Sequence, residues 1–156
     1  MKIGLFGFGC VGQGLWKVLH ETRGVKAEIG RICIKNPEKP RPLSAHFFTT
    51  DPDDILNDPG IDIVVELIDD AEAAFRLVSS ALERGKSVVT ANKKMIAHHL
   101  PELHALQQKT GASLLYEGAG RPGLGLIVKH EDCLFFELKA FTDDLSHKSN
   151  SRGGII

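Results

Sequence analysis

The opening segment constrains the fold of this chain more than any other feature. An apolar run at residues 2–6 leads into the pattern G-x-G-x-x-G, and an amphipathic helical pattern follows it. After a strand, the first glycine permits a tight turn, the second lets backbone N–H groups approach a pyrophosphate, and the third allows close packing of helix on strand. The positive end of the helix dipole adds to the attraction for phosphate. The segment therefore predicts a dinucleotide-binding turn with the contacting residues Gly7, Gly9, Cys10, Val11 and Gly12.

The composition is that of an ordinary globular domain. The chain has 156 residues, of which 42% are hydrophobic and 25% are charged, and this length suits one domain with its own core. The net charge of −1 provides no basic footprint, so we expect neither nucleic acid nor an anionic membrane as a partner. The sequence has no apolar stretch of about 18 residues, and it starts directly with a strand rather than a signal peptide. We therefore expect a cytoplasmic location.

Apolar runs alternate with amphipathic segments along most of the chain. The expected strands cover residues 2–6, 27–34, 47–49, 61–67, 86–90 and 112–116, and the expected helices cover 11–21, 51–56, 71–84 and 100–109. Asp69 or Asp70 is the expected N-cap of the helix at 71–84, while Gly85 and Gly111 end the last two helices. Such alternation is typical of right-handed βαβ units. It predicts an α/β fold of the Rossmann type, a doubly wound parallel sheet in a single domain.

The cysteines do not indicate a disulfide framework or a metal centre. Cys10, Cys33 and Cys133 are widely separated and form no C-x-x-C pair. Cys10 follows the glycine turn, where a helix start can make a thiol reactive. A small residue that fills a tight turn is the simpler interpretation.

The histidines raise a metal hypothesis that the sequence does not support. His98 and His99 are adjacent, and His99 and His104 lie near helical spacing. No cysteine or acidic partner completes a ligand set in the sequence pattern, so we expect no metal at these residues.

Four blocks of the sequence resemble homoserine dehydrogenases. They are F-G-F-G-C-V-G-Q-G-L at 6–15, I-C-I-K-N-P-E-K-P-R at 32–41, V-V-E-L-I-D-D at 64–70 and V-V-T-A-N-K at 88–93, and the step Y-E-G-A at 116–119 is also similar. The resemblance covers about three-quarters of the chain, essentially the nucleotide-binding half of the family. It implies the reduction of aspartate semialdehyde to homoserine with NAD(P)H, in the pathway to threonine, isoleucine and methionine.

The resemblance assigns the cofactor preference to Lys35. This lysine matches the basic residue that faces the ribose 2′-phosphate of NADP in the family. An NAD-type site would have an acidic residue about 20 positions after the glycine turn, whereas this chain has a lysine at the end of its second strand. We therefore expect NADPH to bind in preference to NADH. The alternative is that Lys35 is a solvated surface lysine.

The T-A-N-K block resembles the strand end at which nicotinamide and substrate meet in the family. Thr90, Asn92 and Lys93 are the residues that match, and Lys93 is the candidate for positioning the nicotinamide and the substrate. Alternatively, Lys93 is an exposed charge, as we expect for Lys94. Glu66 lies late in a buried strand, where it either hydrogen-bonds near the ligand or caps local backbone N–H groups.

Two features depart from the family pattern. Asp69 and Asp70 stand where many relatives carry small residues, so the approach of the cofactor can differ there. Glu117 matches a glutamate that helps to bind a monovalent cation in the family, but the segment 120–125, G-R-P-G-L-G, differs from the small residues found there.

The sequence divides into two parts. Residues 1–119 are the expected NAD(P)-binding domain, and residues 120–156 are a divergent and partly disordered tail. The family's catalytic and dimer-forming domain begins with a G-x-x-N-G-x-x-N-like segment that does not occur here, and the general-acid lysine with its aspartate partner belongs to that domain. A homodimer is possible without the usual dimer domain.

Three functions are compatible with this pattern. The chain is the nucleotide-binding half of a homoserine dehydrogenase, truncated or frame-shifted near residue 120. Alternatively, it is a stand-alone NADP-binding module without catalysis, or another amino-acid dehydrogenase of the same nucleotide-binding type.

Overall fold

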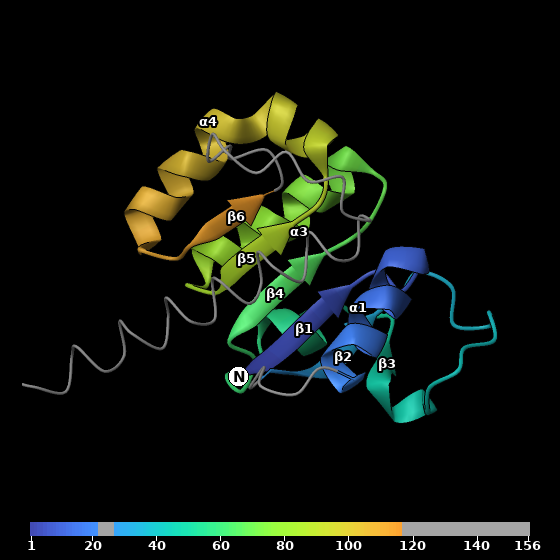
Figure 1. Cartoon of the computed structure of the whole chain (residues 1–156). Helices are drawn as coiled ribbons and strands as arrows, with labels where there is room; N and C mark the ends of the chain where they lie inside the picture. The colour runs from blue at the N-terminus through green and yellow to red at the C-terminus, as the bar shows by residue number, and fades with distance from the viewer. Residues whose placement is uncertain (22–26, 117–156) are drawn as a thin grey trace, which may run out of the picture.

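Six parallel strands form one sheet at the centre of the molecule. The structure is a computed structural model that describes residues 1–21 and 27–116. The strands are β1 (Lys2–Phe6), β2 (Glu28–Cys33), β3 (Phe48–Thr49), β4 (Ile63–Glu66), β5 (Ser87–Thr90) and β6 (Leu114–Tyr116). They are arranged in the order β3-β2-β1-β4-β5-β6 (Figure 1). The chain therefore moves outward first to one side of β1 and then to the other, as the doubly wound fold requires.

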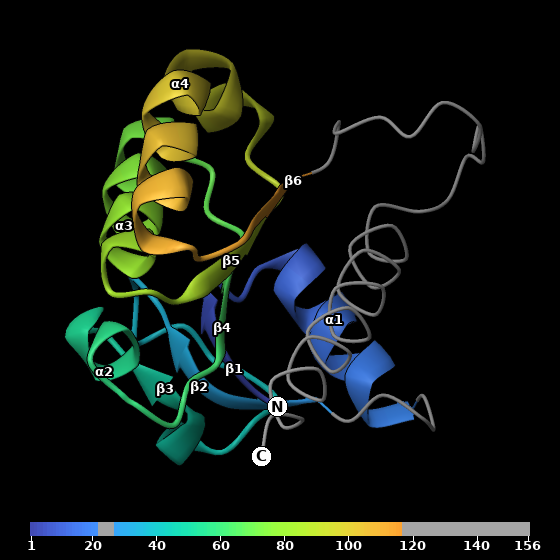
Figure 2. The same cartoon turned by 90° about the vertical axis from the view of Figure 1, so that its left-hand side faces the viewer.

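Helices cover both faces of the sheet. They are α1 (Cys10–Glu21), α2 (Asp53–Leu56), α3 (Ala71–Glu83) and α4 (Lys93–Thr110), with a short 3₁₀ turn, η1, at Ala45–Phe47. Helix α1 lies on one face, whereas α2, α3 and α4 lie on the other (Figure 2). Parallel strands need such helical crossovers, and a sheet covered in this way is buried on both faces.

Each face of the sheet carries its own hydrophobic core. Ile3 and Leu5 of β1 pack with Leu15 of α1 in one cluster, while Phe6 packs with Val78 of α3 in the other. This division follows from the strand geometry, because successive side chains point to opposite faces. All four residues of β4 are buried, which explains why its sequence is nearly continuous in apolar residues.

The predicted order of strands and helices is confirmed, with one boundary clearly wrong. The helix expected at residues 100–109 begins at Lys93 and contains Pro101 in its interior. Proline is typical of the first helical turn, whereas Pro101 lies inside this helix. The actual start is set by Asn92, whose side chain accepts a hydrogen bond from the Met95 N–H at 2.9 Å. The end was predicted correctly, because Gly111 has φ 73° and caps the helix.

Asp70, rather than Asp69, is the N-cap of α3, since its carboxylate accepts the Ala73 N–H at 2.8 Å. The tail at 120–156 lies outside the described residues. None of the helices in the described ranges is long and apolar enough to cross a membrane.

Candidate cofactor site

The glycine turn lies at the carboxyl end of β1, where the strand order reverses. Gly7 has φ 97°, and a Cβ atom there would lie 2.7 Å from the Leu67 carbonyl oxygen. A Cβ at Gly12 would lie 2.7 Å from the Gly7 carbonyl oxygen, so α1 packs closely on the turn. A Cβ at Gly9 would meet no atom within 4 Å. The fold itself requires the first and third glycines, whereas Gly9 faces open space that a ligand can enter.

A cleft of about 540 Å³ opens beside this turn. Its walls come from the turn itself and from the loops that follow β2 and β4. Cys10 lines it and is exposed. These loops all leave the carboxyl ends of neighbouring parallel strands, which is the usual place for a ligand in an open α/β sheet.

The loop after β2 gives the cleft a basic wall. Lys35, Lys39 and Arg41 all line the cleft. The Arg41 guanidinium donates to the Asn36 and Lys39 carbonyl oxygens, each at 2.7 Å, and lies 5.3 Å from the centre of the Phe48 ring. Its Nε atom is buried without a hydrogen-bond partner among the described residues. The loop is therefore folded around Arg41, and its three cations all line the cleft.

Sequence reasoning identified Lys35 at this wall but missed Lys39 and Arg41. These two residues follow Pro37 in a proline-rich loop, where no helical or strand periodicity indicates the direction of a side chain. The available signal was three cations within seven residues of the end of a strand. It could have indicated a phosphate site, because clustered basic residues attract anions.

The acidic pair after β4 has two separate roles. Asp69 is exposed and lines the cleft, where its charge opposes the approach of an anion. The pKa of Asp70 is lowered, mainly by the hydrogen bond from the Ala73 N–H, and the charge of Lys35 contributes slightly. Of the two carboxylates, only that of Asp70 caps α3.

Glu66, Thr90 and Asn92 form a hydrogen-bonded network that joins the ends of β4 and β5. The Thr90 hydroxyl donates to Glu66 Oε2 at 2.5 Å and accepts the Asn92 N–H at 3.0 Å. Glu66 Oε1 accepts the Ile68 N–H at 2.6 Å, and Asn92 Nδ2 donates to the Ile68 carbonyl oxygen at 3.0 Å. The network therefore holds both loops in fixed positions.

The environment of Glu66 supports one of its two predicted roles. Its side chain is fully buried and caps the backbone N–H of Ile68. Burial raises its pKa, and the hydrogen bonds from Thr90 and Ile68 oppose that rise. Glu66 therefore forms its hydrogen bonds within the protein itself, at the base of the loop that lines the cleft.

The predicted site residues fall into two groups in space. The residues at 7–12 and Lys35 come together around the cleft. Thr90 and Asn92 lie at and just beyond the end of β5 with their side chains bonded within the network, and Lys93 is exposed at the first position of α4. These three do not line the cleft. Glu117 lies outside the described residues.

The cleft suits a dinucleotide phosphate on geometric grounds. Gly9 leaves room for a pyrophosphate at the start of α1, and the basic wall lies one strand away, at the end of β2. A sheet in this strand order, with a glycine turn at its reversal point, defines the class of NAD(P)-binding Rossmann domains.

Comparisons with known proteins identify the family. The family model "Homoserine dehydrogenase, NAD binding domain" matches residues 7–117. A homoserine dehydrogenase of Synechocystis is 37% identical over 134 residues, which cover 81% of this chain and 31% of that protein. One of Pseudomonas aeruginosa is 36% identical, covering 100% of this chain and 35% of that protein. The chain belongs to the homoserine dehydrogenase family, whose NAD-binding domain it contains.

Solved structures agree with this family. A homoserine dehydrogenase of Thiobacillus denitrificans matches with a TM-score of 0.68 and 38% identity, over 76% of this chain and 30% of that chain. The chain spans about a third of the length of the relatives it matches. The family is one of oxidoreductases.

Proposed function

We propose that this chain binds NADPH and takes part in the reduction of L-aspartate 4-semialdehyde to L-homoserine. The observation that carries the proposal is the basic wall beside the glycine turn. Membership of the family supports the reaction. Residues 1–119 are the proposed nucleotide-binding domain. A bound NADPH supplies the hydride, and the residues of this domain bind and orient it.

The 2′-phosphate is the group that Lys35, Lys39 and Arg41 select. Two lysines provide mobile charges, and Arg41 provides a planar group already held by the loop. A charge-assisted hydrogen bond to phosphate contributes about 1.5–3 kcal/mol, or roughly ten- to a hundredfold in affinity. NADH lacks this phosphate and therefore gains nothing from the basic wall.

The end of β5 is the proposed position of the nicotinamide and the substrate. The side chains of Thr90 and Asn92 are engaged in the network with Glu66, so we assign their contribution to the backbone that they hold in place. Lys93, exposed at the start of α4, is the proposed group that positions the substrate. The proposed cation-binding role of Glu117 stays a prediction.

Calorimetric titration with NADPH and NADH tests the cofactor preference. We expect the wild type to bind NADPH at least tenfold more tightly than NADH. Lys35→Ala and Lys39→Ala should each weaken NADPH roughly ten- to a hundredfold and leave NADH nearly unchanged. Arg41→Ala should weaken both cofactors, because its side chain also holds the loop.

Lys17→Ala is the matched control for these variants. Lys17 is a highly exposed lysine on α1 that forms an ion pair with Glu21, 4.0 Å away, and its removal should change neither affinity. Equal affinities of the wild type for the two cofactors would overturn the proposed preference. A separate assay that follows NADPH oxidation with L-aspartate 4-semialdehyde tests the reaction. NADPH binding without turnover fits both the nucleotide-binding half of the enzyme and a binding module, and copurification of a separate catalytic chain distinguishes the two.

A further inference from the structure

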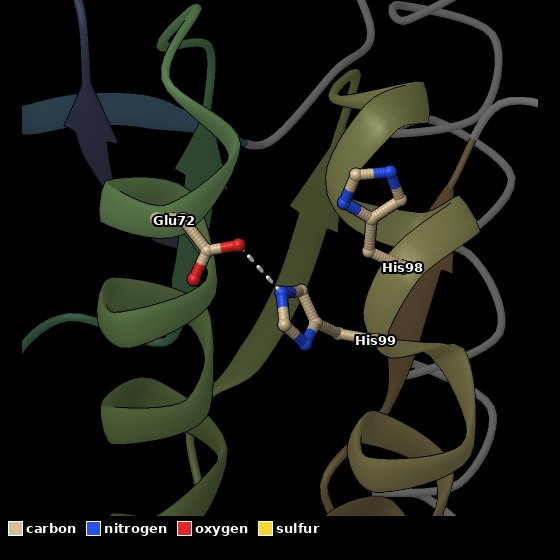
Figure 3. Close-up of side chains that lie close together, drawn as sticks. All are labelled: Glu72, His98 and His99. Carbon is tan, nitrogen blue, oxygen red and sulfur yellow. Dashed lines mark hydrogen bonds and ion pairs between the residues drawn. The ribbon is translucent and has the colours of Figure 1, made fainter.

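A cluster of metal-ligating side chains joins helices α3 and α4. Glu72 lies in the first turn of α3, and His98 and His99 lie in the second turn of α4 (Figure 3). The ligand atoms of the three residues all lie within 4.8 Å of one another. The sequence pattern suggested His104 as the companion of these histidines, but the fold provides Glu72 instead. Glu72 and His99 are 27 positions apart, so their spacing could not reveal the pair.

His99 is held in place by contacts with two residues of α3. Its ring stacks on Phe75, with 3.9 Å between the ring centres and 15° between the planes. Its Nε2 atom lies 3.0 Å from Glu72 Oε1, and its side chain is 19% exposed. A ligand that is already ordered loses less conformational entropy when it binds a metal.

The other two ligands are able to adjust. Glu72 has a side chain that is 62% exposed, and His98 is also exposed. A tetrahedral zinc ion with bonds of about 2.0–2.1 Å separates its ligand atoms by roughly 3.4 Å. The Glu72–His99 pair already has this separation to within a few tenths of an ångström. A ring nitrogen of His98 lies within 4.8 Å of both of these ligand atoms.

We propose that Glu72, His98 and His99 bind a divalent transition-metal ion such as Zn²⁺. Two imidazoles and one carboxylate form a ligand set that suits zinc, and the exposed side of the cluster leaves a fourth position for water. A bound ion would link α3 to α4. Helix α3 begins at Ala71, two residues after Asp69, which lines the cofactor cleft, so the ion would also restrain that end of the cleft. The inference is independent of the proposed reaction.

Calorimetric titration of the full, untagged chain with Zn²⁺ tests the proposal. The chain is used in a Cys10→Ser background, because the exposed thiol is a competing ligand. We expect a site of one ion per chain, which Glu72→Gln, His98→Gln and His99→Gln each weaken at least tenfold. His104→Gln, an exposed histidine of the same helix, is the control and should leave the affinity unchanged.

The variants also separate metal binding from a loss of folding. Glu72→Gln keeps the size of an exposed side chain, and the circular dichroism of all variants should match that of the wild type. An unchanged Zn²⁺ affinity in Glu72→Gln and His99→Gln would overturn the site. An unchanged affinity in His98→Gln alone would overturn the three-ligand arrangement. The sequence also contains His130, Cys133 and His147. If these residues bound the Zn²⁺, binding would persist in all three variants, and that outcome would count against the proposal.

Discussion

Glu66 is a carboxylate at the end of a strand that is buried on both faces. Its two oxygen atoms accept hydrogen bonds from Thr90 and Ile68, which offset part of the cost of burying a charge. Burial is the larger effect and raises the pKa of the group. The folded state therefore favours the protonated carboxyl more than the unfolded chain does.

The raised pKa of Glu66 predicts a pH-dependent stability. Below the ordinary value of 4.5 the carboxyl is protonated in both states, and the contribution is fully present. As the pH rises from there through the raised pKa of the folded state, the unfolded chain ionises first, so the free energy of unfolding falls by about 1.4 kcal/mol for each pH unit of the rise in pKa. Glu66→Gln should remove this fall.

Urea unfolding at a series of pH values from about 4 to about 8 measures the effect. The difference in free energy of unfolding between the wild type and Glu66→Gln should change across this range in favour of the variant. Glu83→Gln, at an exposed position of α3, should run parallel to the wild type. A constant difference between the wild type and Glu66→Gln would contradict the assigned pKa direction.

At the scale of elements, α4 begins at an N-cap residue and has a proline in its interior. Pro101 lies inside the helix, where it lacks an N–H for the usual hydrogen bond. Asn92 stabilises the start of the helix, since its side chain accepts the Met95 N–H and also donates to the Ile68 carbonyl oxygen. One side chain thus begins α4 and ties it to the loop after β4.

Asn92→Ala should lower the free energy of unfolding by about 2 kcal/mol, because it removes an N-cap and leaves a partly buried carbonyl unpaired. Asn92→Ser should lose less, since serine still caps the helix. Chemical unfolding monitored by circular dichroism measures both values. Lys94→Ala, the exposed second position of α4, is the control, and equal stability of Asn92→Ala and the wild type would contradict the role of the cap.

At the scale of the whole molecule, folding and cofactor binding make different demands on the glycine turn. Gly12 is needed so that α1 can pack against the turn. At Gly9, no described atom lies within 4 Å of the position that a Cβ atom would take. The packing of the fold therefore does not require a glycine there. The same short motif therefore contains one residue that serves stability and another that serves the ligand.

Gly12→Ala and Gly9→Ala should separate these two demands. Gly12→Ala should destabilise the protein by about 1–3 kcal/mol through overpacking. Gly9→Ala should retain the wild-type melting temperature without ligand. NADPH at about a hundred times its Kd should stabilise the wild type by about 2.7 kcal/mol, and Gly9→Ala should lose most of this gain at the same concentration.

Thermal unfolding with and without NADPH measures both effects. Gly85→Ala is a useful comparison, because Gly85 has φ 74° but open space around it, so its cost reports backbone strain alone. A Gly9→Ala variant that NADPH stabilises as strongly as the wild type would show that the cofactor does not approach this residue.

Local features explain how much of the molecule the sequence predicts. The apolar run and glycines at 1–12 predicted the first βα unit and its turn, because strand patterning and turn chemistry act over a few residues. The strand at 61–67 was recognised from its β-branched residues, although only Ile63–Glu66 form β4. The start of α4 was placed too late, although Asn92, directly before the true start, is of a residue type that caps helices.

The sequence by itself determined the order of strands and helices, the family and the glycine turn, because each depends on neighbouring residues or on a contiguous motif. Only the tertiary structure decided which distant side chains meet. It placed Arg41 beside Phe48, Glu66 beside Thr90 and Glu72 beside His99. These pairs form because the packing of whole elements brings separate segments together, and no local periodicity encodes that packing.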